Sequence, residues 1–489
     1  MIKGLSGMLI LLLLTATLRS QGDSELIDFQ GGKYTFEFTT LNNLNLGVGS
    51  RVGAMGGDYA GLFPSSESVL WNPANLAFMN HSQWTIDLRP PLVIDPAAFT
   101  DLDAEIHSAV DDGIQDIKGT DFIMTDARYP ELSLKMGARG NFGSGSFAIK
   151  SRYFTIAGAV YKPFEFDLNL IGTGMEARIK TGEPGSALEV AFFSAIDLSV
   201  SANLRIQGMS IGFGRMITPE WSAGASFERL SGVADVTARF LVEGIMVTAG
   251  NERTFNDPND PWYNDLHSSI SGHFNGNCTG ITLGSTYKFG KTWGVGAVLS
   301  MTNALEMNGQ MQIIQHSLPG LNLEAEKDED LLDPTHEDFD ISSPTKTRLL
   351  YNPTGDLLIL NLPSSVGLGT GGKLGFLGIS VNYARYFGEM SYEYAVDRNG
   401  TPIPYSRGLA LSNGFRLGLD FKYLRLCGGV LSAQMIDEVN ESSETDGSTF
   451  LIPNFCMSTG FRILQRLRAD IVLVAMPSGI GKISFSYDM

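Results

Sequence analysis

The sequence predicts an all-β protein: a transmembrane antiparallel β-barrel with an amino-terminal hatch, or plug, that contains short helices. Composition is the first reason, since 43% of the 489 residues are hydrophobic, only 18% are charged, and 56 are glycine. The second is that no apolar run after the first twenty residues approaches the ~18 residues that a spanning helix needs. The third is that apolar and polar residues alternate from about residue 130 onward, as in strands with one apolar face. Such a chain would cross a membrane as β-strands.

Residues 1–20 have the pattern of a secretory signal peptide. A basic start at Lys3 is followed by an apolar block from Met8 to Leu14 and by small residues ending near Ser20. We therefore exclude this segment from the fold. The net charge of −18 argues against nucleic acid as a partner, because phosphate contacts need clustered lysine and arginine.

Residues 47–79 form a glycine-rich segment with a helix-start signal near its end. Gly53, Gly56 and Gly57 allow one backbone to pass close to another. Asn72-Pro73 marks a turn followed by a proline suited to the first turn of a short helix. The pattern suits a compact plug inside a barrel, and on spacing alone a helix–turn–helix stub before the barrel is an equal alternative.

The same segment resembles the amino-terminal hatch of the FadL family of outer-membrane transporters for long-chain fatty acids and other hydrophobic compounds. The resemblance is carried by the run from Arg51 to Gly57, a serine-rich step, Trp71, and the run from Asn72 to Ala77. It implies a barrel of about 14 strands, a hatch that plugs the lumen and rearranges on release, and a lateral opening. The hatch and ligand-pathway residues that it implies are Met55, Gly56, Gly57, Trp71, Asn72, Pro73 and Ala74.

An amphipathic helix is expected over residues 99–117. Its apolar residues recur at spacings of three and four, and Thr100 and Asp103 are placed as a capping box. It would pack against the wall or lie at the mouth of the barrel, and a structural lid is favoured over a recognition element. With it, the amino-terminal hatch region covers residues 21–125, and the barrel covers residues 126–489.

The wall strands are predicted from alternation within 126–489. In Trp221–Arg229 and in Gly414–Tyr423, aromatic and aliphatic residues lie on one face, opposite glycine, serine and charged residues. Each segment has roughly nine to eleven residues, the length of a tilted spanning strand. Similar segments are Ile281–Phe289, Trp293–Met301, Leu377–Tyr383, Leu467–Ala475 and Lys482–Asp488.

Short and long connections are expected to alternate around the barrel. The tight ones are Met216–Glu220, Phe289–Thr292, Gly371–Lys373, Leu424–Leu426 and Leu464–Arg466. The long polar ones, which we interpret as extracellular, are 250–277, 302–356, 386–412 and 434–452. Within the second of these, residues 324–340 are strongly acidic but lack EF-hand spacing, so a solvated loop is favoured over a Ca²⁺ site.

The three cysteines are too few for a disulfide scaffold. Cys427 and Cys456 fall in adjacent expected strands, so pairing is geometrically possible. The alternation places them on opposite faces, however, which favours three unpaired thiols, Cys278 included.

Catalytic and cofactor signals are weak. The six histidines are scattered and lack metal-site spacing. Gly367–Gly372 matches a dinucleotide fingerprint, but a strand follows in place of a helix, so a tight turn is expected. Gly284–Thr292 resembles a phosphate loop with one residue too many and spans the end of a hairpin. We therefore expect no enzyme, no cofactor and no metal.

The expected function is passive uptake of hydrophobic small molecules, such as long-chain fatty acids, across the outer membrane. The expected partners are outer-membrane lipid and the hydrophobic ligand. The alternative is a PorV-like outer-membrane component of type IX secretion, which would bind secreted protein cargo through its long polar loops.

Overall fold

The computed structural model describes sixteen stretches of the chain. They are residues 26–30, 33–42, 52–89, 92–94, 123–127, 131–138, 141–181, 190–248, 251–255, 266–290, 292–317, 346–351, 356–396, 403–439, 449–476 and 480–489. The expected signal peptide (1–20), the amphipathic helix (99–117) and the acidic segment (324–340) lie outside these stretches.

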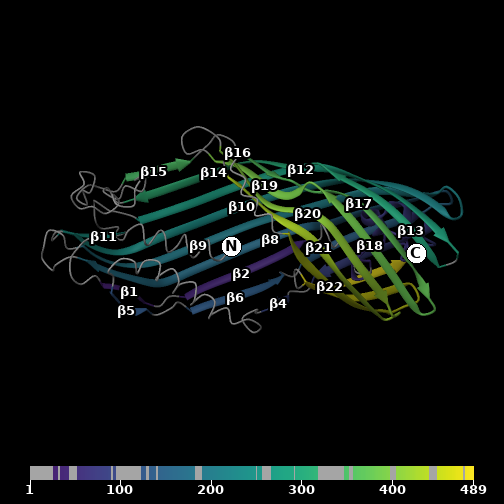
Figure 1. The fold of residues 1–489 in the computed structure, drawn as a ribbon, viewed down its shortest axis with the longest axis horizontal. Helices are drawn as coiled ribbons and strands as arrows, with labels where there is room; N and C mark the ends of the chain where they lie inside the picture. Colours follow the sequence, from purple (N-terminus) through teal and green to yellow (C-terminus); the bar gives the residue numbers. More distant parts are fainter. Residues whose placement is uncertain are drawn as a thin grey trace.

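The described strands close into an antiparallel barrel of 14 wall strands (Figure 1). The first seven are β3 (Gln83–Arg89) with β4 (Leu92–Ile94), β6 (Glu131–Ala138) with β7 (Asn141–Lys150), β8 (Thr155–Thr181), β9 (Val190–Met216), β10 (Trp221–Thr248), β12 (Leu266–Phe289), and β13 (Trp293–Thr302) with β14 (Leu305–Ser317). The eighth wall strand is made of three segments, β15 (Lys346–Tyr351), β16 (Asp356–Leu360) and β17 (Ser364–Leu374), and the ninth of two, β18 (Leu377–Phe387) and β19 (Glu389–Val396). The last five are β20 (Ile403–Asp420), β21 (Leu424–Val439), β22 (Thr449–Arg462), β23 (Leu467–Met476) and β24 (Ile480–Asp488). Neighbours among these 14 strands pair antiparallel, and β24 pairs with β3, which closes the ring. The predicted fold class is confirmed.

The amino-terminal strands also belong to the wall. β2 (Lys33–Asn42) pairs antiparallel with β8 and parallel with β6. β1 (Leu26–Gln30) continues this arrangement and lies between β8 and β5 (Ile123–Ala127). Elsewhere in the wall, β11 (Asn251–Phe255) forms a hairpin with the end of β10. In Figure 1, β2 accordingly lies between β8 and β6. The region 21–125 assigned to the hatch from sequence thus includes wall strands as well as a plug.

Near the short connections the barrel is apolar outside and mainly polar inside. Along β20, Phe415 and Leu417 are 47% and 39% exposed, whereas Arg416 between them is 5% exposed. Along β10, Trp221 and Phe227 are exposed while Ser222 and Ser226 are buried. The alternation predicted for both segments is confirmed. The apolar face is the exposed one, as in a wall that faces lipid, whereas a water-soluble protein would bury its apolar face in a core. Among the described residues, no helix is long and apolar enough to span a membrane.

A lysine on the outer face is expected to weaken membrane insertion strongly. Phe227 is 48% exposed on the outer face of β10, and Phe227→Lys should cost about 2–4 kcal/mol if this position lies near the bilayer midplane. Ile217→Lys is the matched control, because Ile217 is also exposed but lies in a short turn, where the cost is about 0–1 kcal/mol. Reversible folding into vesicles measures both, and equal costs would contradict the assigned lipid face.

The strands are much longer than predicted. β8 and β9 have 27 residues each and β10 has 28, whereas a tilted strand crosses a bilayer in roughly nine to eleven. At about 3.3 Å per residue, β8 is roughly 90 Å long. Parts of the predicted loops 250–277, 302–356, 386–412 and 434–452 are therefore strand. They were interpreted as loops because polar residues are frequent in them, although Phe274, Leu305, Met307 and Leu411 are buried apolar residues of these strands.

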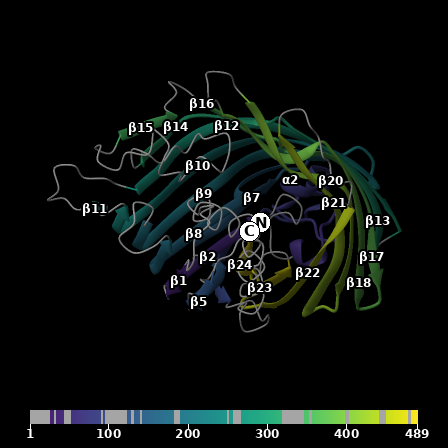
Figure 2. The ribbon, with the colours of Figure 1, turned by 60° about the vertical axis from the view of Figure 1, so that its left-hand side comes forward.

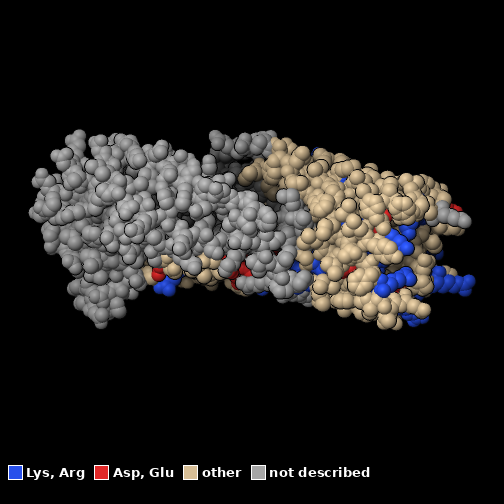
Figure 3. Space-filling model, turned by 90° about the horizontal axis from the view of Figure 1, so that it is seen from below, with Lys and Arg blue, Asp and Glu red and all other residues tan. Residues whose placement is uncertain are grey.

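The short connections lie together at one end of the barrel. Three of the five lie as predicted, after β9, β12 and β22, but those after β17 and β20 are at residues 375–376 and 421–423. Gly367–Gly372 is part of strand β17, so the tight turn expected there is wrong, while Gly284–Thr292 does span a hairpin end. Lysine and arginine side chains gather at this end on the face that Figure 3 shows.

Strand β8 is interrupted where its partner changes. Its pairing with β7 ends at Tyr161, its pairing with β2 begins at Phe164, and its register with β9 shifts between these residues. Pro163 lies in this bulge, where a residue without an N–H is tolerated. Arg89, 4% exposed on β3, contacts Glu165 across 3.2 Å, so a buried ion pair lies beside the discontinuity in the wall.

Candidate functional site

The hatch is the segment 52–82, which lies inside the barrel near the short connections. It contains the 3₁₀ helix η1 (Gly53–Met55), the single helical turn α2 (Ser68–Trp71) and the 3₁₀ helix η2 (Pro73–Phe78). Figure 2 shows α2 within the ring of strands. Most residues from 52 to 79 are buried. A segment so short and so enclosed depends on the wall for its partners, because isolated helices of this length are unstable.

Asn72 organises the carboxyl half of the hatch. Its Oδ1 accepts a hydrogen bond from the Ala74 N–H at 3.1 Å, with Pro73 in the first turn of η2. The predicted turn and helix start are therefore confirmed. Its Nδ2 donates to the Tyr59 carbonyl at 2.7 Å and to Thr286 Oγ1 at 2.9 Å. One amide thus caps a helix, ties two parts of the hatch together and attaches them to β12.

Further polar bonds attach the hatch to the wall. Asn382 Nδ2 on β18 donates to the Gly57 carbonyl at 3.1 Å. Lys150 Nζ on β7 donates to the Ala77 carbonyl at 3.0 Å, and the Lys288 ammonium on β12 donates to the Gly61 carbonyl. Ser66 Oγ lies 2.8 Å from Ser146 Oγ on β7. Each such bond contributes about 1 kcal/mol. The hatch is therefore held by many weak bonds from several strands around the barrel.

Of the ionisable hatch residues, Asp58 and Glu67 are buried and Tyr59 is partly buried. Asp58 accepts hydrogen bonds from the N–H groups of Leu62 and Phe63, both at 2.7 Å, and thereby closes a hatch turn. Burial raises the pKa of the Asp58 carboxyl, and these hydrogen bonds and the nearby Lys288 charge oppose that effect. Burial also raises the pKa of Tyr59 to about 12, so Tyr59 stays neutral at physiological pH.

Wall glycines form a cradle for the hatch backbone. A Cβ at Gly418 would collide with the Met55 carbonyl, one at Gly224 with Pro73, and one at Gly296 with the Tyr59 carbonyl. A Cβ at Gly214 would lie 2.5 Å from the Pro73 carbonyl oxygen. Bare backbone on the inner face of four strands therefore lets the hatch lie directly against the wall.

All seven residues assigned from the sequence lie in the hatch. Met55 and Trp71 are buried in one apolar group with Val52 and Phe63. Gly56 and Gly57 have φ values of 71° and 107°, and a Cβ at Gly57 would lie 2.8 Å from the Trp71 ring. Asn72, Pro73 and Ala74 start η2. The structure thus brings them together as packing and anchoring groups, and their role in a ligand pathway stays a prediction.

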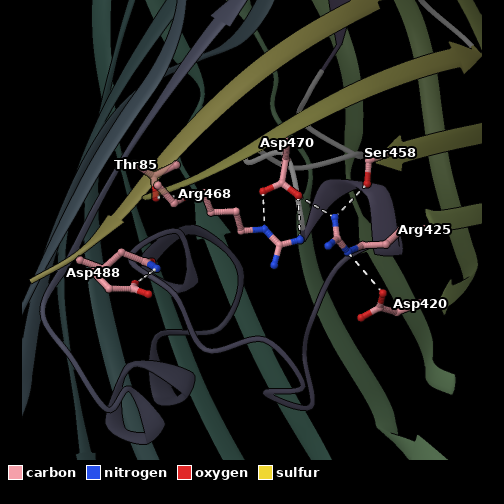
Figure 4. A network of polar contacts seen from close by, with 9 residues as sticks. Thr85, Asp420, Arg425, Ser458, Arg468, Asp470 and Asp488 are labelled. Carbon is pink, nitrogen blue, oxygen red and sulfur yellow. Dashed lines mark hydrogen bonds and ion pairs between the residues drawn. The ribbon is translucent and has the colours of Figure 1, made fainter. Parts of the chain in front are cut away.

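A buried charge network adjoins the hatch (Figure 4). Arg425 on β21 is fully buried and lies 2.8 Å from Asp470 and 3.5 Å from Asp420. Arg468 contacts the other oxygen of Asp470 at 2.7 Å. Because each charge has an opposite partner, the network can exist in the lumen beside an apolar hatch turn.

The predicted orientation of two cysteines is wrong. Cys427 and Cys456 are directly opposite on β21 and β22, and both point inward, where they pack with Ala54 of the hatch. Both are free thiols, as is Cys278. The orientation was misjudged because β21 carries apolar residues on both faces: Leu431 and Ala433 are buried on the inner face, and Leu424 and Val430 are exposed on the outer face. The positions of the apolar residues therefore do not show which side chains point inward.

An apolar lumen cluster lies beyond the hatch, toward the long connections. It consists of Ile206, Leu230, Ala234, Phe274, Cys278, Leu305, Met307, Leu360 and Leu362. Leu305 and Met307 at the start of β14 extend over the lumen, since a Cβ at Gly232 on β10 would lie 2.6 Å from Leu305 Cδ2. Nearer the hatch, the same inner face carries Ser222, Ser226, Thr282 and Thr286. The chain is a membrane-spanning β-barrel plugged by its own hatch.

Bilayer-spanning barrels of this type belong to outer membranes, so the outer-membrane location predicted from the sequence stands. No protein-family model and no curated protein sequence matches this chain. Solved structures do match over most of its length. The toluene transporter TbuX of Ralstonia pickettii is 12% identical, with a TM-score of 0.46, covering 91% of this chain and 99% of that one.

The toluene transporter TodX of P. putida is 11% identical, with a TM-score of 0.45 and coverage of 91% and 99%. A FadL homologue of Pseudomonas aeruginosa is 14% identical, with a TM-score of 0.45 and coverage of 92% and 99%. FadL is also the family that residues 47–79 resemble. Similarity at this level decides neither fold nor function, so the fold assignment depends on the strand pairing itself.

Sequence reasoning missed the wall side of the site. The cradle glycines, Asn382 and Thr286 were not singled out. A signal for the glycines exists: Gly214, Gly224 and Gly284 occupy inward positions near the short-connection ends of β9, β10 and β12. Glycines at the same level along the barrel axis in neighbouring strands indicate that another backbone lies against the inner face there.

Proposed function

We propose that the protein allows hydrophobic small molecules to cross the outer membrane passively through the barrel. The observation that carries this proposal is the apolar lumen cluster beyond the hatch. Lumens that conduct water and polar solutes are lined by polar residues, whereas sites for hydrophobic molecules are lined by apolar side chains with a few polar groups. Long-chain fatty acids, expected from the sequence resemblance, are one candidate class of ligand.

Passage requires the hatch to rearrange, because it fills the lumen near the short connections. Its attachment by many separate polar bonds supports a local change, since each bond can be exchanged for one to water at small net cost. The ion pair and bulge at β8 supply a discontinuity in the wall through which an apolar molecule could leave toward the bilayer. The wall and the cluster would thus guide the ligand, and the hatch would control its release.

A cross-link between hatch and wall is expected to block uptake. Ser66 and Ser146 have their Oγ atoms 2.8 Å apart, which suits a disulfide in the double variant Ser66→Cys/Ser146→Cys. Uptake of a radiolabelled hydrophobic compound by cells should fall at least about tenfold when the pair is oxidised and recover after reduction. Each single variant is the control. Unchanged uptake with a complete cross-link would show that the hatch does not need to move.

Lipid extraction tests the ligand class directly. Mass spectrometry of hydrophobic molecules that co-purify with the protein, compared with an unrelated barrel prepared in parallel, should show selective enrichment. Enrichment of fatty acids would support the finer expectation. Co-purification of secreted proteins without enriched small molecules would contradict the proposal and favour a PorV-like role.

A further inference from the structure

Glu228 lies between the hatch and the apolar lumen cluster. It is on β10, two residues from Ser226, which is buried on the hatch side, and two from Leu230, which belongs to the cluster. The alternation of β10 directs its side chain inward, since Phe227 and Arg229 on either side of it are exposed on the outer face. A ligand moving from the cluster to the hatch would pass this carboxyl group.

The cross-strand neighbours of Glu228 are small. Its cross-strand partners are Ser210 on β9 and Gly280 on β12. An ideal Cβ at Gly280 would lie 3.4 Å from Glu228 Oε2, so a side chain there would contact the carboxyl group. The glycine thus places no side chain of β12 against the carboxyl group.

Glu228 also differs from the other acids of the lumen. Asp470 is paired with Arg425 and Arg468, and Glu165 with Arg89. Within the described stretches, the Glu228 carboxyl makes no hydrogen bond or ion pair, although it is partly buried beside Cys278 and Leu230. An acid held against apolar groups without a partner is costly unless another molecule supplies a donor.

We infer that Glu228 binds the head group of the transported molecule, and that the preferred ligands are apolar molecules with a hydrogen-bond-donating head, alkylammonium ions above all. The apolar tail would lie among the cluster residues and the head would meet the carboxylate. Charge-assisted hydrogen bonds are about twice as strong as neutral ones. A fatty carboxylate at the same place would meet a like charge. This inference rests on the proposed function and gives it a ligand class.

The test compares three ligands with the same C12 chain: dodecylammonium, dodecanol and dodecanoate. The barrel is placed in lipid nanodiscs, and each ligand displaces a neutral fluorescent apolar probe, with empty nanodiscs correcting for partition into lipid. For the native protein, dodecylammonium should displace the probe at a concentration about tenfold or more below that for dodecanoate. Dodecanol should lie between them.

The variant Glu228→Gln should bring the ammonium and carboxylate values to within about twofold of each other. Binding of the neutral probe should be unchanged, which shows that the variant folds and keeps its apolar site. Glu306→Gln is the matched control, because Glu306 is exposed and lies outside the lumen face of β14; it should keep the native preference.

The outcomes separate the two proposals. If the neutral probe does not bind the native barrel, the proposed transport of hydrophobic molecules fails. If the probe binds but the three head groups are equivalent, or if Glu228→Gln keeps the preference for ammonium, the role of Glu228 is overturned and the transport proposal survives.

Discussion

Gly418→Ala is expected to detach the first turn of the hatch. A Cβ at Gly418 would collide with the Met55 carbonyl, and Met55 is fully buried, so neither backbone can move without breaking other contacts. Overpacking of this kind costs about 1–3 kcal/mol. We expect thermolysin to cleave within residues 52–82 of the variant under conditions that leave the native hatch intact, and uptake of small hydrophobic probes to rise.

The control for this substitution is on the adjoining strand. Gly428 on β21 is opposite Leu417, and a Cβ there would meet nothing within 4 Å. Gly428→Ala should therefore leave proteolysis unchanged. If both variants resist thermolysin like the native protein, the close approach of Gly418 to the hatch does not hold the hatch in place.

Arg425→Met is expected to destabilise the barrel more than any other single change discussed. It removes a fully buried guanidinium and leaves Asp420 without this partner, while Asp470 keeps only Arg468. Breaking a buried ion pair by removing one partner costs about 3–5 kcal/mol, because the remaining charge stays buried. The temperature at which the compact, fast-migrating form is lost on cold gels should fall markedly.

Two comparisons check the cause. Arg462→Met removes an exposed arginine at the end of β22 and should have little effect, since surface charges contribute about 0–1 kcal/mol. The double variant Arg425→Met/Asp470→Asn should recover part of the loss, because it also removes a buried charge. An equal loss in the single and double variants would show that the packing of Arg425 matters more than its charge.

The sequence predicts the barrel well because one property repeats in every strand. In a wall between lipid and a polar lumen, apolar and polar residues must alternate along each strand. Segments of nine or ten residues, such as Trp221–Arg229 and Gly414–Tyr423, are therefore enough to predict the fold class. The start of η2 could also be predicted, since Asn72 and Pro73 act on their immediate neighbours. Both features depend only on residues that are close together in the chain, so a single sequence is enough to predict them.

Features that depend on distant partners could not be predicted. The membrane-distal parts of β12, β14, β20 and β21 fall within the segments 250–277, 302–356, 386–412 and 434–452, which the sequence led us to interpret as loops. Gly418 requires Met55 on its inner side, some 360 positions earlier in the chain, and nothing in its own strand indicates that neighbour. The orientation of Cys427 failed for a related reason, since β21 has apolar groups on both faces.

The place of β2 in the wall limits how the hatch can move. The hatch is continuous with wall strands at both ends: β2 ends at Asn42 and β3 begins at Gln83. A plug tethered on one side could swing out of the barrel as a unit. A plug tethered on both sides keeps its connection to β3 and to β2, and β2 itself is held to β8 by a ladder of ten residue pairs. If the hatch opens as we propose, it therefore does so as a loop whose two ends stay attached to the wall, by a change of its own shape.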